Sequence, residues 1–319
     1  GLPALTWRGR RLLLGAWRRQ RRWEYWPRWV FYPPIVLCGI LPAALRRRSL
    51  ALVTAVNPGI PTGGLVGESK AAILDGLGGG SELARHRLLP PGDQEARVAA
   101  ACELGWPVVI KPDVGERGRD VQFARNAEEA RAVIATRPHP LLAQEFASGA
   151  EFGVFWVREP GVEWGRVTSI ARKELPEVVG DGVSTLERLI LAHPRHVNMG
   201  KHLLEVNAER LAEVPAAGER ILLSRLGTHA RGATFHDANH LHTPELAAAI
   251  ERISRRFAGF HLGRYDLRAP SEEDLCAGRG IKVLELNGLT SEPTHIYDPA
   301  ARLLPAWRAL IAQWRLAYA

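Results

Sequence analysis

The sequence predicts an α+β fold, and three observations predict it. Short β-branched segments such as Trp106–Lys111 are interspersed with amphipathic helical patterns such as Glu245–Phe260. Several strand-like segments follow one another through glycine-containing turns, which indicates antiparallel hairpins rather than helical crossovers. The chain has 319 residues, 46% of them hydrophobic, and so is long enough to bury a sizeable core. We therefore expect antiparallel sheets with helices, in preference to a doubly wound sheet.

The first 48 residues form a basic, aromatic arm. They contain eleven arginines, one acidic residue (Glu24) and five of the ten tryptophans. Since the whole chain carries +8, the arm holds +10 and the other 271 residues sum to −2. Arginine together with tryptophan is typical of a bilayer interface, where both side chains face headgroups. The sequence thus predicts that the arm, residues 1–48, associates with an anionic membrane surface.

The apolar part of the arm is Trp29–Leu45. Its 17 residues are at the short limit for crossing a bilayer, and Pro33, Pro34 and Pro42 remove backbone donors that lipid cannot replace. We expect an interfacial or re-entrant hairpin, preceded by a basic helix. The alternatives are packing on its own protein or on a second subunit, and RNA binding. A signal peptide fits less well because no small-residue cleavage site follows cleanly.

The remaining elements are expected in the following order. Residues 49–92 are rich in glycine and proline and predict a loop-rich lead-in with one short helix near Glu68–Leu77. From Asp93 the pattern becomes regular, and residues 269–280 form a polar hairpin between the last two strands. Helices are predicted over Gln94–Leu104, Ala127–Thr136, Ser184–Ala192, Glu245–Phe260 and Pro299–Tyr318, and strands over Trp106–Lys111, Val121–Ala124, Leu141–Glu145, Glu151–Val157, Gly165–Glu174, Gly263–Leu267 and Ile281–Leu286.

A lysine at a strand end is the first candidate for chemistry. Lys111 leads into a loop that contains Gly115 and Gly118. A compact ammonium beside glycines, whose backbone N–H groups can approach closely, suits a polyphosphate, whereas the alternative is an ordinary hairpin. The chain has only five lysines against 37 arginines. Because lysine is so rare here, its presence at positions 111 and 173 favours a specific role for Lys111 and Lys173.

Acidic residues at neighbouring strand ends are the second candidate. Gln144 and Glu145 end one strand and Glu151 begins the next. A strand edge can offer backbone groups to an adenine, and a carboxylate can hold ribose hydroxyls. The alternative is that these acids are simply solvated.

The third candidate is a metal site on two strands joined by a hairpin. Alternation puts Arg264 and Asp266 on one face of the first strand, and Glu285 and Asn287 on one face of the second. Three oxygen ligands on paired strands suit Mg²⁺, which completes its octahedron with waters and phosphates. A buried acid–acid pair without a cation would be costly, so a purely structural role is unattractive. Arg264 beside them could neutralise a transferring phosphoryl group.

In this order the motifs resemble the ATP-grasp superfamily, and within it the D-alanine–D-alanine ligase type of carboxylate–amine ligase. The resemblance covers roughly residues 84–300 and is most specific in GRYDL (263–267) and VLELN (283–287). Residues 179–186 also resemble an element of cyanophycin-synthetase-like ligases. The family implies an ATP-grasp fold, in which two α/β lobes with antiparallel sheets clamp ATP.

The resemblance implies a role for each matching residue. Asp266, Glu285 and Asn287 would hold two Mg²⁺ ions, with Mn²⁺ able to substitute, and Arg264 would stabilise an acyl phosphate. Lys111 looks like the phosphate-binding lysine and Lys70 like an upstream lysine. The segment Gly115–Asp120 resembles the mobile glycine loop, Gln144-Glu145 the adenine hinge, and Glu151 the ribose carboxylate.

Two segments depart from the family. The lead-in is too short for a complete N-terminal substrate domain, and Asn287-Gly288 is followed by LTSEPTH, which leaves the acceptor site unassigned. In the polar stretch 225–242, Arg225, His229 and Arg231 are candidates to line the substrate side of the cleft. A solvated loop is the alternative. A zinc site on the histidines of this stretch is disfavoured, because no second cluster completes it.

The resulting hypothesis is an ADP-forming ATP-grasp ligase that joins a carboxylate to an amine through an acyl phosphate. The expected organisation is an arm (1–48), a lead-in (49–92), a small lobe (93–147) and a large lobe (148–319). We expect a cytoplasmic protein, peripheral on the inner face of the cell membrane, with carboxylate and amine substrates that include amphiphilic ones, no nucleic-acid partner, and compatibility with a homodimer. An ATP-grasp kinase acting on a hydroxyl and a non-catalytic nucleotide-binding scaffold are the alternatives.

Overall fold

The computed structural model describes residues 3–115, 120–225, 227 and 232–319. The chain forms two compact units. Residues 1–34 and 173–235 make up the first, and residues 35–172 and 236–319 make up the second. These units cut across the expected organisation, because the arm is shared between them and the large lobe is divided. The expected α+β class with antiparallel sheets is confirmed.

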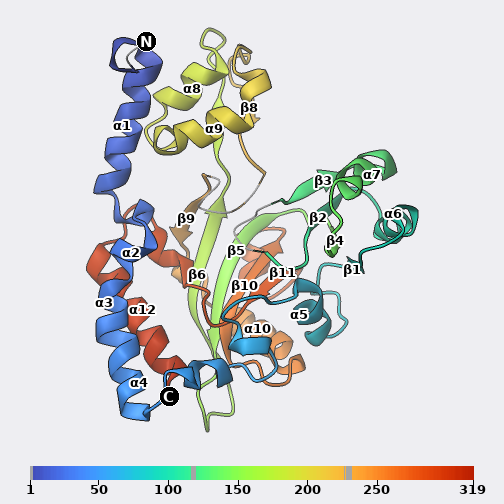
Figure 1. Ribbon diagram of the computed structural model, residues 1–319, viewed down its shortest axis with the longest axis vertical. Helices are drawn as coiled ribbons and strands as arrows, with labels where there is room; N and C mark the ends of the chain where they lie inside the picture. Colours follow the sequence, from blue (N-terminus) through green and yellow to red (C-terminus); the bar gives the residue numbers. More distant parts are fainter. Residues whose placement is uncertain (1–2, 116–119, 226, 228–231) are drawn as a thin grey trace. The chain divides into compact units, whose positions relative to one another are not determined.

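The second unit contains a four-stranded sheet in the order β1-β4-β2-β3, with every pair antiparallel. Two helices lie beside it (Figure 1). Asp93 and Asn126 start these helices by accepting hydrogen bonds from backbone N–H groups of their first turns, as N-cap residues do. The six elements are β1 (His86–Leu89), α6 (Gln94–Cys102), β2 (Val108–Pro112), β3 (Gln122–Ala124), α7 (Ala127–Ala135) and β4 (Leu141–Glu145).

A five-stranded sheet in the order β11-β10-β5-β6-β9 forms the main body. Its strands β6 and β9 run across the boundary between the two units. Trp156 on β5 and Phe260 stack in the core with ring centroids 5.3 Å apart, and Tyr265 is fully buried beside Phe260. The strands are β5 (Ala150–Val157), β6 (Arg166–Glu174), β9 (Thr234–Asp237), β10 (Leu262–Ala269) and β11 (Lys282–Asn287), with helices α5 (Lys70–Gly76), α10 (Pro244–Arg256) and α11 (Glu272–Cys276).

The lead-in is more ordered than the turn signals indicated. It supplies β1, which the sequence prediction missed, and the short helix α5, close to the predicted one. Asn57 ties the lead-in to the start of β10: its amide donates to the carbonyls of Gly63 and Leu262 and accepts from the N–H groups of His261 and Leu262. Because Asn57 is fully buried with all of these groups satisfied, the loops around it have one defined path.

The apolar half of the arm is helical, so the expected hairpin is wrong. From Arg28 to Arg47 short helical segments follow one another: α2 (Arg28–Phe31), α3 (Pro33–Ile35), a π-helical stretch (Val36–Ile40) and α4 (Leu41–Arg47). Pro42 has no N–H that could donate to the Cys38 carbonyl, one turn earlier in the helix. Arg315 takes its place, because its Nη2 donates to that carbonyl at 3.2 Å, and this helps the helix to tolerate the proline. No helix in the described part of the chain is long and apolar enough to cross a membrane.

Helix α12 (Leu303–Ala317) supports this part of the arm (Figure 1). A Cβ on Gly39 would lie 3.3 Å from the Cα of Ile311, so the two backbones approach closely. Ile35 and Ala44 are buried as well. The second half of the arm is therefore part of the core of its own unit.

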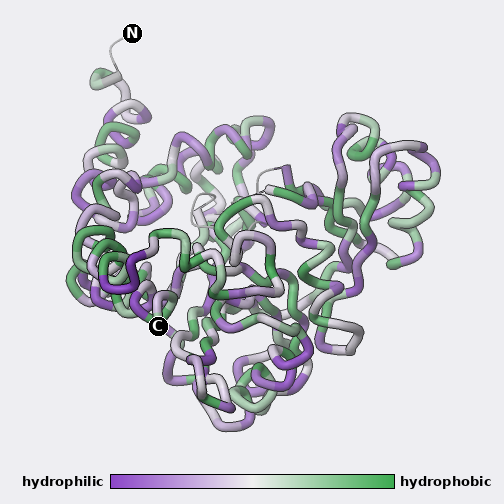
Figure 2. The backbone as a smooth tube through the Cα atoms, turned by 60° about the horizontal axis from the view of Figure 1, so that its bottom comes forward, coloured by the Kyte–Doolittle hydropathy of each residue, from purple (hydrophilic) through white to green (hydrophobic). Residues whose placement is uncertain are grey.

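The first unit holds the basic half of the arm, α1 (Trp7–Arg21), against the segment 186–206. Hydrophilic and hydrophobic segments alternate along α1 (Figure 2). Arg11 donates to the carbonyls of Leu191 and Ala192 at 2.8 and 3.0 Å, the last carbonyls of helix α8. A cation is stabilising at that end of a helix, where carbonyls lack partners. The other elements of this unit are β7 (Glu177–Val179), α8 (Leu186–Ala192), α9 (Gly200–Val206) and β8 (Arg220–Leu222).

Candidate functional site

The two adjacent strands β10 and β11 bring four predicted site residues together. Arg264 pairs with Asn287 and Asp266 with Glu285 in the antiparallel register. Directly opposed residues share one face of a sheet, so all four side chains lie on the same face. The predicted constellation is therefore assembled by strand register alone.

Asp266 is the centre of this group. Arg264 donates to both of its carboxylate oxygens, from Nε at 3.0 Å and from Nη2 at 3.3 Å, and Asn287 Nδ2 donates to Oδ2 at 3.3 Å. Burial alone would lower the pKa of Arg264, but the charge and hydrogen bonds of Asp266 outweigh it and raise that pKa. A third contact, from Arg264 Nη1 to the Glu292 carbonyl at 3.0 Å, fixes the guanidinium in place.

The donor set fits a magnesium ion. Asp266 and Glu285 supply carboxylates and Asn287 an amide oxygen, which are the hard ligands that Mg²⁺ takes, with waters and phosphates completing the octahedron. Within the described residues, no three His, Cys, Asp or Glu side chains gather in a metal-holding group. An ion bound here would compete with Arg264 for Asp266.

Lys111 lies on β2, with its ammonium buried near these acids. Its side chain is 8% exposed and donates to Gln144 Oε1 at 3.0 Å and to the Leu284 carbonyl at 3.4 Å. Burial lowers the pKa of Lys111, while the charges of Glu285, Asp266 and Glu151 oppose this shift. The four-stranded sheet and β11 of the five-stranded sheet therefore meet at this lysine.

Lys70, at the start of α5, is close enough for its charge also to lower the pKa of Lys111. Its ammonium donates to the carbonyls of Asp113 and Gly115 at 3.2 and 2.7 Å. The structure thus brings both predicted lysines to the end of β2. Gly118, the other predicted loop glycine, lies outside the described residues.

The predicted hinge and ribose residues are held by basic partners. Glu145 pairs with Arg85 at 2.6 Å and with Lys282 at 3.2 Å. Burial alone would raise the pKa of Glu145, but these contacts outweigh burial and lower the pKa. Glu151 pairs with Arg268 at 3.1 Å. Gln144 is buried and donates to the Leu284 carbonyl at 3.0 Å. Any use of Glu151 by a ribose would have to share or replace the Arg268 contact.

The remaining predicted site residues belong to the first unit or lie outside the described residues, whereas the group above belongs to the second unit. Lys173 and Arg225 belong to the first unit, where the Lys173 ammonium lies 5.9 Å from the centre of the Phe235 ring. His229 and Arg231 lie outside the described residues. Their proposed roles stay predictions.

The segment after Asn287 contributes residues that the sequence left unassigned. Thr294 is 5% exposed, and its hydroxyl finds no hydrogen-bond partner among the described residues. It lies near Arg264 and Asp266, because a Cβ on Gly153 would be 2.9 Å from Thr294 Oγ1, 3.3 Å from Arg264 Cδ and 3.7 Å from Asp266 Oδ1. Gly153 in the middle of β5 was a signal for this close approach, since a strand glycine often makes room for a neighbouring group.

The residue after Thr294, His295, contacts a serine on β6. Ser169 Oγ lies 2.6 Å from His295 Nδ1, and burial lowers the pKa of His295 despite the opposing charge of Asp237. His295 is half-buried and directly follows Thr294 in the sequence. No local pattern links residues 169 and 295, and the sequence could not have paired them.

Neither a family model nor a curated protein matches the sequence. Solved structures do match. A bifunctional glutathione synthetase from Pasteurella multocida is 16% identical over 76% of this chain and 36% of its own, with a TM-score of 0.41. D-alanine–D-alanine ligase from Bacillus anthracis is 12% identical over 77% and 65%, with a TM-score of 0.42. The ATP-grasp ligase PsnB, complexed with a variant precursor, Mg and ADP, is 17% identical over 77% and 58%, with a TM-score of 0.39.

This chain spans less than two thirds of the length of each of these three proteins. The chain is thus similar, at 12–17% identity, to a bifunctional synthetase and two ligases.

Proposed function

We propose that this protein is an ATP- and magnesium-dependent ligase that joins a carboxylate to an amine through an acyl phosphate. One observation carries the proposal: Arg264, Asp266, Glu285 and Asn287 share a sheet face, and the charges of Asp266 and Glu285 act on buried Lys111. Such a set of opposite charges suits a site for polyphosphate and metal. Positioning and electrostatic stabilisation suffice for phosphoryl transfer, so no side-chain nucleophile is required.

Each side chain of the site has a separate role in this proposal. Lys111, held by Gln144 and the Leu284 carbonyl, presents a positive charge to the phosphates. Arg264, held by Asp266 and the Glu292 carbonyl, would stabilise the charge of a developing acyl phosphate. Magnesium bound at Asp266, Glu285 and Asn287 would supply charge neutralisation across the transferring phosphate. The Thr294 hydroxyl has capacity to hydrogen-bond a substrate group beside them.

The proposal is tested by the ratio of ADP to inorganic phosphate that the protein forms. The protein is incubated with ATP, Mg²⁺ and pools of carboxylates and amines, and ADP and inorganic phosphate are measured together. Equal amounts of ADP and phosphate that appear only when both pools are present support the ligase. ADP without phosphate would mean transfer to a hydroxyl acceptor, and formation of neither product would leave only nucleotide binding; either result contradicts the proposal.

We also propose that the protein works at an anionic membrane surface. Leu37, Leu41 and Leu45, spaced four residues apart, are 62%, 40% and 69% exposed. They are followed by exposed arginines at 46–48, and residues 25–48 contain no acidic side chain. An exposed leucine stripe beside arginines is the pattern of a helix that lies in a lipid interface. We call Leu37, Leu41 and Leu45 the leucine stripe.

A further inference from the structure

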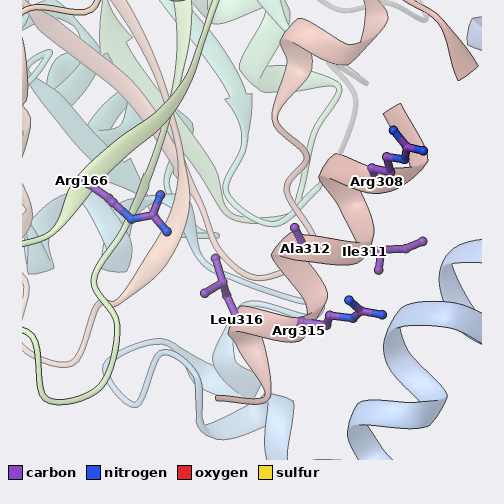
Figure 3. A pocket seen from close by; sticks show the side chains of 6 residues that line it. All are labelled: Arg166, Arg308, Ile311, Ala312, Arg315 and Leu316. Carbon is purple, nitrogen blue, oxygen red and sulfur yellow. The ribbon is translucent and has the colours of Figure 1, made fainter. Parts of the chain in front are cut away.

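A pocket of about 630 Å³ lies on helix α12, and none of its lining residues belongs to the candidate site. Figure 3 shows Arg166 from β6 on one side, with the other lining residues along α12. The volume is in the range that accommodates a small molecule. The lining residues are Arg166, Arg308, Ile311, Ala312, Arg315 and Leu316.

Three guanidinium groups and no carboxylate line this pocket. Arg166 is partly neutralised by Glu159 at 2.8 Å, outside the lining. Arg315 donates to a neutral carbonyl, that of Cys38, and Arg308 makes no side-chain hydrogen bond or ion pair within the described residues. The charges of Arg308 and Arg315 are therefore uncompensated, and an anion would relieve their mutual repulsion.

The rest of the lining is apolar and comes from the same helix. Residues 308, 311, 312, 315 and 316 follow the spacing that places side chains on one side of a helix. Ile311 and Leu316 are half-buried, so an apolar surface lies beside the arginines. A purely inorganic anion would leave this apolar surface unused, whereas a purely apolar ligand would leave the two charges unpaired.

We propose that this pocket binds an anionic amphiphile, with its phosphate or carboxylate head on Arg308 and Arg315 and its chain over Ile311 and Leu316. Arginine matches such heads because it can donate two parallel hydrogen bonds. The molecule can come from a bilayer or be a free amphiphile in solution. The pocket lies on the helix against which Gly39 packs, so it is within the same unit as the leucine stripe.

The first experiment uses isothermal titration calorimetry of the whole protein with dihexanoyl phosphatidate, which is monomeric in water. We expect saturable binding that weakens about tenfold in Arg308→Gln and roughly a hundredfold in Arg308→Gln/Arg315→Gln, with inorganic phosphate much weaker than the phosphatidate. Arg308→Gln breaks no hydrogen bond or ion pair within the described residues, and Arg315→Gln loses the bond to the Cys38 carbonyl, so a thermal melt checks the fold of both variants. Arg125→Gln, which removes one exposed arginine on the four-stranded-sheet side, is the charge-matched control and should bind normally.

The second experiment identifies the source of the ligand. Co-sedimentation is measured with phosphatidylcholine vesicles with and without phosphatidylglycerol. If Arg308→Gln/Arg315→Gln loses both phosphatidate and vesicle binding, the ligand is a bilayer lipid; if only phosphatidate binding is lost, it is a free amphiphile. Unchanged phosphatidate binding in the double variant, an equal loss in Arg125→Gln, equal binding of inorganic phosphate, or no binding by the wild type would overturn the proposal. ADP formation is a separate measurement, so failure here leaves the ligase proposal standing.

Discussion

Glu285 and Asp266 face one another across two strands, but they differ in what holds them. Asp266 is bound by Arg264 and Asn287, whereas the side chain of Glu285 makes no hydrogen bond or salt bridge within the described residues. Removing the charge of Asp266 would leave buried Arg264 without its partner. Breaking a buried pair in this way costs about 3–5 kcal/mol of stability, which would confuse any activity measurement. Glu285 is therefore the cleaner residue for testing the metal site.

Glu285→Gln should lower magnesium-dependent ADP formation by about a hundredfold or more, because one of two charged ligands is lost. The melting temperature should stay close to that of the wild type. Steady-state ADP formation at several Mg²⁺ concentrations, with a thermal melt, is the measurement. Glu273→Gln, at an exposed glutamate on α11 whose side chain makes no contact in the described structure, is the matched control. Near-normal turnover in Glu285→Gln would rule out the metal assignment.

His196 in the first unit is a second residue whose surroundings make a test possible. It is 7% exposed and stacks on His193 with ring centroids 3.8 Å apart. Burial, followed by the charges of His193 and Arg195, lowers the pKa of His196 from 6.5 to about 3. The folded unit therefore favours the neutral ring, so the stability from this residue is complete above pH 6.5 and is lost as the pH falls toward about 3.

His196→Phe should flatten the acid side of the stability profile, because the new ring packs in the same place but cannot take a proton. The free energy of unfolding in urea, measured as a function of pH between 6.5 and about 3, should fall less steeply than in the wild type. His240→Phe, at an exposed histidine, is the control and should leave the slope unchanged. The same slope in His196→Phe and wild type would show that this residue does not set the acid sensitivity.

At the scale of elements, α1 is positioned by a small residue and by arginines. A Cβ on Gly15 would lie 2.1 Å from the Val197 carbonyl oxygen, so only glycine allows this approach. Arg11 then reaches the end of α8, and Arg18 donates to the Pro194 carbonyl at 3.2 Å. The sequence interpretation assigned these arginines to a membrane. The structure gives Arg8, Arg11 and Arg18 partners on their own protein, which agrees with the alternative of an arm packed on its own chain.

Gly15→Ala should push α1 away from the 196–199 turn and cost about 1–3 kcal/mol, since the added methyl meets backbone rather than a flexible side chain. Trypsin should then cut the arm, which is rich in arginine, faster than in the wild type. Gly79→Ala places its methyl in open space and serves as the control. Equal rates of cleavage in all three proteins would contradict the packing of α1 described here.

At the scale of the whole molecule, the positive charge of the chain is concentrated in the arm. The arm holds +10 against −2 for the rest, and part of its positive charge is bound within the protein, where Arg11 caps α8 and Arg8 pairs with Glu187. Phe31, Ile35 and Ala44 are buried, so deletion of residues 1–48 would remove core side chains from both units. A membrane test therefore has to change exposed side chains and leave the arm in place.

The triple variant Leu37→Gln, Leu41→Gln and Leu45→Gln should lose affinity for vesicles that contain phosphatidylglycerol by roughly tenfold per leucine, because apolar surface no longer enters the lipid. Co-sedimentation of the full chain measures this, and wild-type binding should fall as salt is raised. Val66→Gln, Leu88→Gln and Val162→Gln remove three other exposed apolar side chains as a control. Unchanged binding of the leucine triple variant would refute the membrane role of the stripe.

The elements of the fold were largely predictable where the pattern was local and strong. The strand Leu141–Glu145 has the predicted bounds, and α6 and α7 start where Asp93 and Asn126 cap them. The predicted hairpin between the last two strands is confirmed, with the short helix α11 in its connection. The short strands β1, β7, β8 and β9 and the helix α9 were missed, because such short segments depend on neighbours that are distant in sequence. The prolines of the arm predict a hairpin instead of the observed helix, because Arg315, which compensates for the missing N–H of Pro42, lies 277 residues from Cys38 in the sequence.

By itself, the sequence determined the α+β class and the grouping of Arg264, Asp266, Glu285 and Asn287, because strand alternation and a short hairpin are local properties. Only the tertiary structure decided that Lys111 lies buried beside them, that Thr294 faces the same place, and that Arg11 caps α8. These contacts join residues far apart in the chain, and their free energy depends on which buried groups find partners once the units have folded. The same long-range packing also decides which side of the arm is buried, with Ile35 and Ala44, and which side is exposed, with the leucine stripe.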